Sequence, residues 1–313
     1  MARVAVVEDA SARHAAHVAP RHPERPDRIE AIRAHLTTTA GLRELPRLAA
    51  EPVDDGDLLR VHDAQHIARV AALCAAGGGH FDADTYAMAA SDVAARVSAG
   101  GAVRAVEAVV GGEFDATFAV VRPPGHHATA SSAMGFCLYN NVAVAVQHAR
   151  QVRGVGRVAI VDIDVHHGNG SEATFWNDPD VLYTSLHQYP FYPGTGAAGD
   201  RGGAHAKGLT VNVPLPSGTS AEAWLRAFDD AVLPALQAFE PELLVVSCGF
   251  DAHRDDPLAE LLLDTQTYAA VADRLASLSA PAGGRTAWVL EGGYDLDALA
   301  GSTQAVLEVL VRA

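Results

Sequence analysis

Short, nearly continuous apolar runs alternate with longer alanine-rich segments along almost the whole chain of 313 residues. The apolar runs predict strands at residues 3–7, 116–121, 158–162, 181–185, 209–213, 243–247 and 286–290. The segments between them predict helices at residues 24–36, 64–76, 91–110, 141–152, 221–238, 265–278 and 296–311. This alternation indicates an α/β fold, in which a central, mainly parallel sheet is covered by helices on both faces. Because composition shifts nowhere along the chain, we expect a single three-layer domain over residues 1–313.

Charge and cysteine content limit the partners and the compartment. The net charge of −15 disfavours direct binding to nucleic acid. Three scattered cysteines, Cys74, Cys137 and Cys248, fit a reducing cytoplasm better than a disulfide framework. No apolar run approaches the roughly 18 residues of a transmembrane helix, and the first residues lack the features of a signal peptide. We therefore expect a cytoplasmic protein without a membrane partner, while the oligomeric state stays open.

Polar clusters directly follow four of the predicted strands. FAVV runs into RPPGHHA, VAIV into DIDVHHGNG, LLVVSC into GFDAHRDDP, and AWVL into EGGYD. Open α/β sheets bind ligands at the carboxyl edge of their strands, so these clusters predict one common site. The adjacent His126 and His127 could also be a solvated surface pair. Four clusters at one edge are hard to explain in that way, and a Pro-Pro-Gly turn allows both rings to converge on a pocket.

Asp164, His166 and Asp251 are the candidate ligands of a metal ion. If residues 162–166 remain extended, Asp164 and His166 share one face of the strand. Asp251 is the best third ligand because it also lies where a strand gives way to a loop. Carboxylate and imidazole ligands suit zinc or iron(II) better than calcium or magnesium, and a catalytic zinc site keeps three protein ligands. The alternative interpretation of Asp164 and His166 is a hydrogen-bonded loop pair.

Six motifs in order along the chain resemble those of the histone deacetylase family: RPPGHHA, GFCLYNN, DIDVHHGNG, FYPGTG, GFDAHRDDPL and EGGYD. The resemblance extends from HPERP at residues 22–26 to Tyr294. With Asn169 after the second histidine pair and Glu291 before Gly-Gly-Tyr, the chain is most similar to class II members and bacterial histone deacetylase-like amidohydrolases. The fold of this family, shared with arginases, is a single α/β domain with a central parallel sheet, in agreement with the predicted elements.

The resemblance implies a zinc-dependent amide hydrolase that removes acetyl or other acyl groups from lysine-type amines. Asp164, His166 and Asp251 would hold one zinc ion per chain, with iron(II) as the alternative. The metal would polarise the substrate carbonyl and acidify a water molecule. His127 would be the main general base and acid, and His126 a charged stabiliser beside it.

Further residues have roles by the same resemblance. Asp162 would pair with His126 and Asn169 with His127, and an asparagine should raise the pKa of its histidine less than an aspartate would. Tyr294 would donate a hydrogen bond to the developing oxyanion. A structural potassium ion is expected beneath the zinc, held by Asp162, Ser185 and backbone carbonyls near residues 164, 166 and 186, including that of Leu186.

The predicted substrate tunnel depends on four residues. Phe136 and Tyr192 match its aromatic walls, and Gly135 lines the same slot. Leu258 lies where family members specialised for acetylated polyamines carry an acidic residue, so it favours an acylated lysine or another neutral-tailed amide. The sequence leaves open whether the substrate is a protein lysine, a small acylated amine or a metabolite, and which acyl length is preferred.

Two other functions remain alternatives. An arginase-like ureohydrolase shares the fold, but it needs more carboxylates for a second metal, and Gly168 and His253 stand where these could fall. A non-catalytic protein that binds acylated lysine should have lost Tyr294 or one of the paired histidines, and all are present. Metal content per chain and turnover of an acetyl-lysine peptide would distinguish these functions from a deacetylase.

Overall fold

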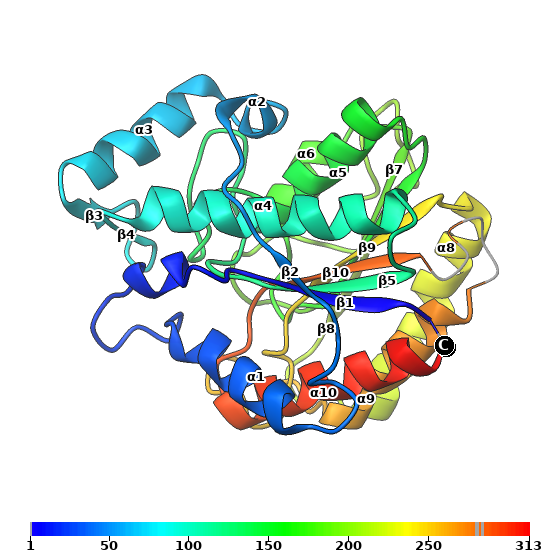
Figure 1. Cartoon of the computed structure of the whole chain (residues 1–313). Coiled ribbons are helices and arrows are strands. Elements are labelled where there is room, and N and C mark those ends of the chain that lie inside the picture. The colour runs from blue at the N-terminus through cyan, green and yellow to red at the C-terminus, as the bar shows by residue number, and fades with distance from the viewer. Residues whose placement is uncertain (1, 279–281, 283–284) are drawn as a thin grey trace.

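An eight-stranded sheet runs through the centre of the computed structural model, which describes residues 2–278, 282 and 285–313 (Figure 1). The strands lie in the order β2-β1-β5-β10-β9-β6-β7-β8, and every neighbouring pair is parallel. Their bounds are β1 Val4–Glu8, β2 Arg47–Ala49, β5 Ala116–Val120, β6 Val158–Asp162, β7 Val181–Gln188, β8 Thr210–Leu215, β9 Leu243–Cys248 and β10 Thr286–Leu290. The central strands are buried throughout, as their continuous apolar runs require.

Helices cover both faces of this sheet (Figure 1). One face carries α3 Ala64–Ala75, α4 Ser91–Val110 and α5 Asn141–Arg153, whose apolar residues share a core with the sheet. The other face carries α1 Asp27–Thr38, α7 Ala221–Ala227, α8 Leu233–Phe239, α9 Thr265–Ala276 and α10 Leu296–Arg312, with a second core. The predicted three-layer α/β architecture is therefore confirmed. Its extent as a single domain over residues 1–313 stays a prediction.

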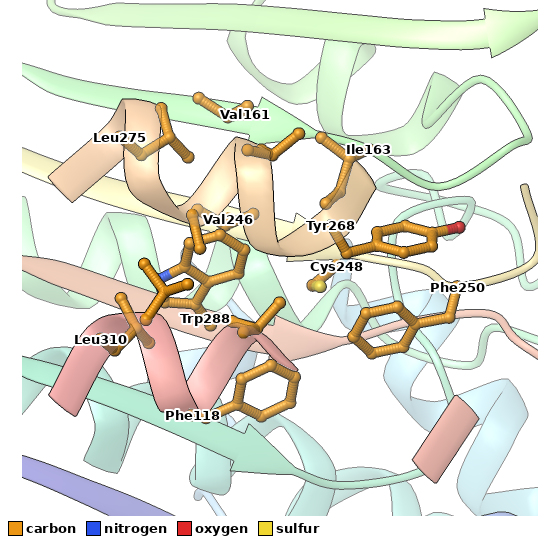
Figure 2. Packing of buried hydrophobic residues seen from close by; sticks show 14 of the residues in the cluster. Phe118, Val161, Ile163, Val246, Cys248, Phe250, Tyr268, Leu275, Trp288 and Leu310 are labelled. Carbon is orange, nitrogen blue, oxygen red and sulfur yellow. The ribbon is translucent and has the colours of Figure 1, made fainter. Parts of the chain in front are cut away.

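Aromatic packing beneath the sheet supports one of the site loops. Figure 2 shows the buried side chains between α9, α10 and the sheet. The ring of Phe250, two residues after the end of β9, stacks 6.4 Å from Phe118 and meets Tyr268 edge to face at 4.9 Å. Full burial of such a side chain stabilises the fold by roughly 1.5–3 kcal/mol. This packing fixes the loop on which Asp251, the next residue, is presented.

The structure differs from the sequence-based elements in several places. α1 begins at Asp27 and not at residue 24, because the residue before Pro26 is disfavoured in a helical conformation. The predicted helix over residues 221–238 contains a π-helical segment, η2 Phe228–Val232, between α7 and α8. Six short elements were not predicted: η1 Arg13–Ala16, α2 Asp55–Leu58, α6 Asn169–Phe175, the edge strand β2, and the two strands of a hairpin, β3 Gly78–His80 and β4 Tyr86–Met88. These elements have three to seven residues, too few for a clear periodic pattern.

Two further observations concern the cysteines and the helices. Cys74, Cys137 and Cys248 are all buried and free. Within the part of the chain that the structure describes, no helix combines the length and the apolar character needed to cross a membrane.

Candidate active site

A pocket of about 230 Å³ opens at the carboxyl edge of four neighbouring strands. These strands, β5, β10, β9 and β6, carry the four polar clusters and are consecutive in the sheet, so their loops meet. The pocket is lined by Asp84, Pro124, His126, His127, Gly135, Phe136, Asp164, His166, Phe191, Tyr192, Leu258, Gly292 and Tyr294. The structure thus brings residues from three of the four clusters into one cavity, and Leu258, which directly follows GFDAHRDDP, lines it as well.

Asp164 and His166 line this pocket, and Asp251 lies directly beside them. One ligand atom from each falls within 4.8 Å of the others, and no other group of this kind occurs among residues 2–278, 282 and 285–313. Nδ1 of His166 is 3.1 Å from Oδ1 of Asp164 and 3.2 Å from Oδ2 of Asp251. β6 ends at Asp162, so the expectation of an extended segment to residue 166 is wrong, and Asp164 and His166 lie in a bend instead.

The donor atoms of this group fit a divalent cation. Oδ2 of Asp251 is buried and has no hydrogen-bond partner. Burial, reinforced by repulsion from Asp164, raises the pKa of Asp251 to about 7. A cation shared by both carboxylates would offset this cost, and two carboxylates with one imidazole are a donor set that zinc accepts.

Glycine is required beside the carboxylates. A Cβ atom on Gly292 would lie 2.1 Å from Oδ2 of Asp251 and 2.6 Å from Oδ2 of Asp164, closer than non-bonded atoms approach. The backbone N–H of Gly292 instead donates a 2.8 Å hydrogen bond to Asp164. The N–H of Val165 donates to Oδ1 of Asp251 at 2.9 Å. The backbone therefore fixes both carboxylates and leaves one oxygen of Asp251 for a ligand.

His126 is paired with a carboxylate. Its Nδ1 lies 3.0 Å from Oδ2 of Asp162, and both side chains are buried. Burial opposes protonation of His126, but the charges of Asp162 and Asp164 outweigh it and raise its pKa to about 10. A charged His126 is therefore the state that this environment favours.

His127 lies against His126 but has the opposite environment. The two ring centroids are 4.0 Å apart, and Nδ1 of His127 is 2.9 Å from Oδ1 of Asn169. Burial and the neighbouring charge of His126 hold the pKa of His127 well below its usual value. The neutral amide of Asn169 raises the pKa of His127 too little to offset this lowering. This agrees with the expectation that an asparagine raises the pKa of its histidine less than an aspartate would.

Tyr294 completes the group of polar side chains around the pocket. Its ring meets that of Phe136 edge to face at 5.9 Å, and only 9% of the residue is exposed. Burial raises the pKa of Tyr294 well above its usual range, so the phenol keeps its proton at neutral pH. The backbone N–H of Tyr294 donates to Oδ2 of Asp256 at 2.7 Å.

The four predicted tunnel residues all line the pocket. Tyr192 meets the ring of His127 edge to face at 5.1 Å and is 41% exposed, so it lies at the pocket mouth. Gly135 has φ +55°, and a Cβ atom there would lie 2.3 Å from Cδ2 of His127. Leu258 adds an apolar side chain to the lining. Its backbone N–H donates to Oδ1 of Asp256 at 3.0 Å.

The predicted potassium ligands lie in register on neighbouring strands. Asp162 on β6 pairs with Ser185 on β7, and Leu186 follows, all three being buried. The hydroxyl of Ser185 lies 2.9 Å from Nδ1 of His187. Nε2 of His187 is 2.9 Å from the carbonyl of Gly196 and must donate to it, so Nδ1 accepts from Ser185. The oxygen lone pairs of Ser185 are thus left for another partner.

Reasoning from the sequence missed several residues of this site. Glu291, used only as a family marker, is fully buried and accepts the backbone N–H groups of Gly125 and His126 at 2.6 and 3.2 Å. Burial raises the pKa of Glu291 to about 7. Phe191 stacks on His166 at 5.3 Å, and Asp84 lies on the pocket lining. In the sequence, the only indications of a role were that Glu291 precedes Gly-Gly-Tyr and that Phe191 precedes Tyr192. Asp84 lies in the turn between β3 and β4, which the sequence did not predict.

The chain is similar to known deacetylases. The model of the histone deacetylase domain matches residues 22–310. A histone deacetylase-like amidohydrolase of Pseudomonas aeruginosa is 44% identical over 261 residues, which cover 83% of this chain and 67% of that protein. A probable deacetylase of Methanothermobacter thermautotrophicus is 40% identical over 257 residues, covering 81% of this chain and 76% of that protein. The crystal structure of the HDA15 HD domain is similar with a TM-score of 0.93 at 40% identity, covering 99% of this chain and 91% of that chain.

Proposed function

Because this chain belongs to the histone deacetylase family of hydrolases, we propose that it is a zinc-dependent enzyme that removes acetyl or other acyl groups from lysine-type amines. One observation supports the proposal above all. Two of the three candidate metal ligands, Asp164 and His166, share a pocket with a neutral histidine, a charged histidine and a protonated phenol, and the third, Asp251, lies beside them. These are the groups that hydrolysis of an amide needs: a Lewis acid, a base, a stabilising charge and an oxyanion donor.

Asp164, His166 and Asp251 would hold the metal. When bound, zinc would polarise the amide carbonyl and lower the pKa of a water molecule. Iron(II) is the alternative ion for the same donor set.

His127 would move the protons of the reaction. The hydrogen bond to Oδ1 of Asn169 places the imidazole proton on Nδ1 and leaves Nε2 unprotonated. Nε2 takes the proton of the attacking water while the new C–O bond forms. The same atom then delivers this proton to the amine nitrogen as the C–N bond breaks, which yields a carboxylic acid and a free amine. The acid then releases the second proton of the water molecule and becomes a carboxylate. His126, held charged by Asp162, stabilises the negative charge that develops beside it.

Tyr294 would stabilise the tetrahedral oxyanion. Its phenol is protonated and its ring is fixed between Phe136 and the guanidinium of Arg28, whose Cζ lies 4.9 Å from the ring centroid. A single oxyanion donor of this kind contributes about 10²–10³ in rate.

The shape of the pocket favours an unbranched chain that ends in a neutral acyl group. Phe136 and Tyr192 present aromatic walls that suit the methylenes of a lysine side chain. Leu258 at the lining offers no charge to a second ammonium, which argues against acetylated polyamines. An acylated lysine, free or in a protein, is therefore the favoured substrate class.

A monovalent cation near β6 and β7 is part of the same proposal. Asp162 supplies charge, while the hydroxyl oxygen of Ser185 and the carbonyl of Leu186 supply neutral oxygen ligands. Potassium would also stabilise the charge of Asp162 when His126 titrates. Replacement of potassium by sodium during purification should lower the melting temperature, and an unchanged melting temperature would contradict this site.

The test is a fluorogenic acetyl-lysine peptide incubated with metal-reconstituted protein, with and without a chelator. We expect turnover that the chelator removes and zinc restores, with one zinc per chain. A second transition metal per chain with no amide turnover would favour an arginase-like ureohydrolase. Binding of the peptide without turnover would identify a non-catalytic reader and contradict the proposal.

A further inference from the structure

Glu24 does not line the pocket, yet its carboxylate connects two loops that do. We propose that Glu24 is a positioning residue that holds the loop of the paired histidines, residues 122–127, and the loop of Tyr294, residues 291–294, in fixed relation to each other. The inference rests on the proposed function, because it concerns the placement of the proposed base and oxyanion donor. Glu24 lies before α1 and is fully buried.

The first connection runs through Arg122, which directly precedes the Pro-Pro-Gly-His-His segment. Its Nε donates to Oε1 of Glu24 at 2.6 Å, and its second terminal nitrogen donates to Oε2 at 2.5 Å. This two-point geometry fixes the orientation of a guanidinium as well as its position. The other terminal nitrogen of Arg122 donates to the carbonyl of His14 at 2.5 Å, so each nitrogen of the guanidinium has an acceptor. The histidine loop therefore leaves β5 from a fixed point.

The second connection runs through Arg28, which lies four residues after Glu24 in the first turn of α1. A terminal nitrogen of Arg28 donates to Oε1 of Glu24 at 3.2 Å. Its other donors bind the carbonyls of Gly293 and Glu291, at 2.6 and 2.5 Å. The guanidinium plane also covers the ring of Tyr294. Arg28 thus binds the tyrosine loop on both sides of Gly292, and Glu24 fixes Arg28.

The carboxylate of Glu24 compensates the charges of two buried arginines. Arg122 and Arg28 are buried guanidiniums, with 1% and 0% of their surface exposed, and Glu24 lies between them. Removing one partner of a buried ion pair leaves the other charge uncompensated, so the remaining groups must move. Without Glu24, the two arginines repel each other across the space that the carboxylate filled. A shift of Arg122 would displace the histidine loop, and a shift of Arg28 would displace the tyrosine loop, so the two loops would move relative to each other.

The main test compares turnover by the zinc-loaded wild type and its Glu24→Gln variant, which keeps the shape and removes the charge. We expect kcat to fall by about a hundredfold, as for a misplacement of roughly 1 Å, with KM and zinc content nearly unchanged. In a Tyr294→Phe background the same substitution should cost at least about threefold less, because the hydroxyl that it misplaces is absent. An equal loss in both backgrounds would show general destabilisation and overturn the proposal.

A second readout does not depend on turnover. Hydrogen exchange should accelerate together in peptides covering residues 122–128 and 291–295 of Glu24→Gln. The matched control is Glu107→Gln, which removes a carboxylate paired with His148 far from the pocket and should leave both peptides unchanged. Exchange that rises in one loop alone, or across the whole chain, would contradict the proposal. A wild type without chelator-sensitive turnover would instead refute the proposed function. The exchange result would still show whether Glu24 connects the histidine loop to the tyrosine loop.

Arg122→Lys covers the case in which Glu24→Gln does not fold. Lysine keeps the buried charge but loses the two-point contact. We expect a folded protein with a smaller fall in kcat and faster exchange in residues 122–128. Wild-type kcat and exchange in this variant would mean that the contact between Glu24 and Arg122 positions nothing.

Discussion

Nδ1 of His127 lies 2.9 Å from the amide oxygen of Asn169, a partner that accepts a hydrogen bond but carries no charge. This contact selects the tautomer with an unprotonated Nε2. It leaves the pKa of His127 to burial and to the charge of its neighbour, which both lower it. His127 is therefore the one imidazole of the pair that is available as a base at neutral pH.

Replacing His127 by alanine should reduce amide hydrolysis by about 10²–10⁴, the contribution of a general base, to near background. The zinc content of the variant should remain that of the wild type, because His127 is not among the candidate ligands. Steady-state rates and elemental analysis measure the two effects. His148→Gln, which changes a histidine held between Asp57 and Glu107, is the matched control and should retain its rate. Retained turnover in His127→Ala would remove this residue from the mechanism.

Tyr294→Phe removes one hydroxyl and leaves the packing against Phe136 in place. We expect kcat to fall by at least about a hundredfold with little change in KM, since the hydrogen bond is made to the developing oxyanion. The measurement is the full dependence of the rate on acetyl-lysine peptide concentration. A rate near that of the wild type would assign oxyanion stabilisation to another group.

Asp251→Asn tests the metal site through stability as well as through metal content. The variant should bind less than one zinc per chain and lose turnover. The folded protein raises the pKa of Asp251 above its unfolded value, so ionisation at pH 8 costs folding free energy when no cation is bound. Chelator-treated Asp251→Asn should therefore melt at a higher temperature than the chelator-treated wild type.

The control for this experiment is Asp273→Asn, a change at an exposed position of α9. Its zinc content and melting temperature should follow those of the wild type with and without chelator. Full zinc loading of Asp251→Asn would exclude Asp251 as a ligand.

Leu258→Glu places a carboxylate on the pocket lining, where the wild type is apolar. The added charge should attract the second ammonium of an acetylated polyamine. We expect the ratio of kcat/KM for an acetylpolyamine to that for acetyl-lysine to rise, and Leu258→Gln to leave it nearly unchanged. If the ratio is the same in all three proteins, selectivity between these amines lies elsewhere.

His62 predicts a pH dependence of stability away from the metal. It is buried, with Nε2 accepting the N–H of Asn140 at 2.9 Å and Nδ1 2.9 Å from the carbonyl of Thr129. Burial and the nearby His66 lower its pKa to about 3. The unfolded chain binds this proton near pH 6.5 and the folded chain does not, so stability is lost as the pH falls below 6.5.

Between pH 7.5 and pH 5.5 this one group should reduce the free energy of unfolding by about 1.4 kcal/mol. Urea unfolding of chelator-treated wild type and His62→Gln at both pH values measures the difference. His62→Gln should be less stable than the wild type at pH 7.5. Between pH 7.5 and pH 5.5 its free energy of unfolding should fall by about 1.4 kcal/mol less than that of the wild type. An identical loss in both proteins would mean that His62 is protonated in the folded state.

The order of apolar runs and polar clusters determined the architecture and the edge of the sheet at which the site lies. Burial of a strand on both faces requires a continuous apolar run, so β5, β6, β9 and β10 could be located within a residue or two. The start of α1 could not, because it depends on how Pro26 restricts its neighbour. β2, with three residues at the edge of the sheet, forms through backbone pairing with β1, and no side-chain pattern records it.

Only the tertiary structure decided which distant residues face each other. Strand order makes β5, β10, β9 and β6 neighbours, and this brings Asp251 to Asp164 and Tyr294 to the pocket. The contacts of Glu291 with Gly125 and of Glu24 with Arg122 span 166 and 98 residues. Local periodicity and spacing report the environment of a segment on its own helix or strand. They do not indicate which loops the packing of the sheet will bring within hydrogen-bond distance. The contacts of Glu24 and Glu291 depend on that packing.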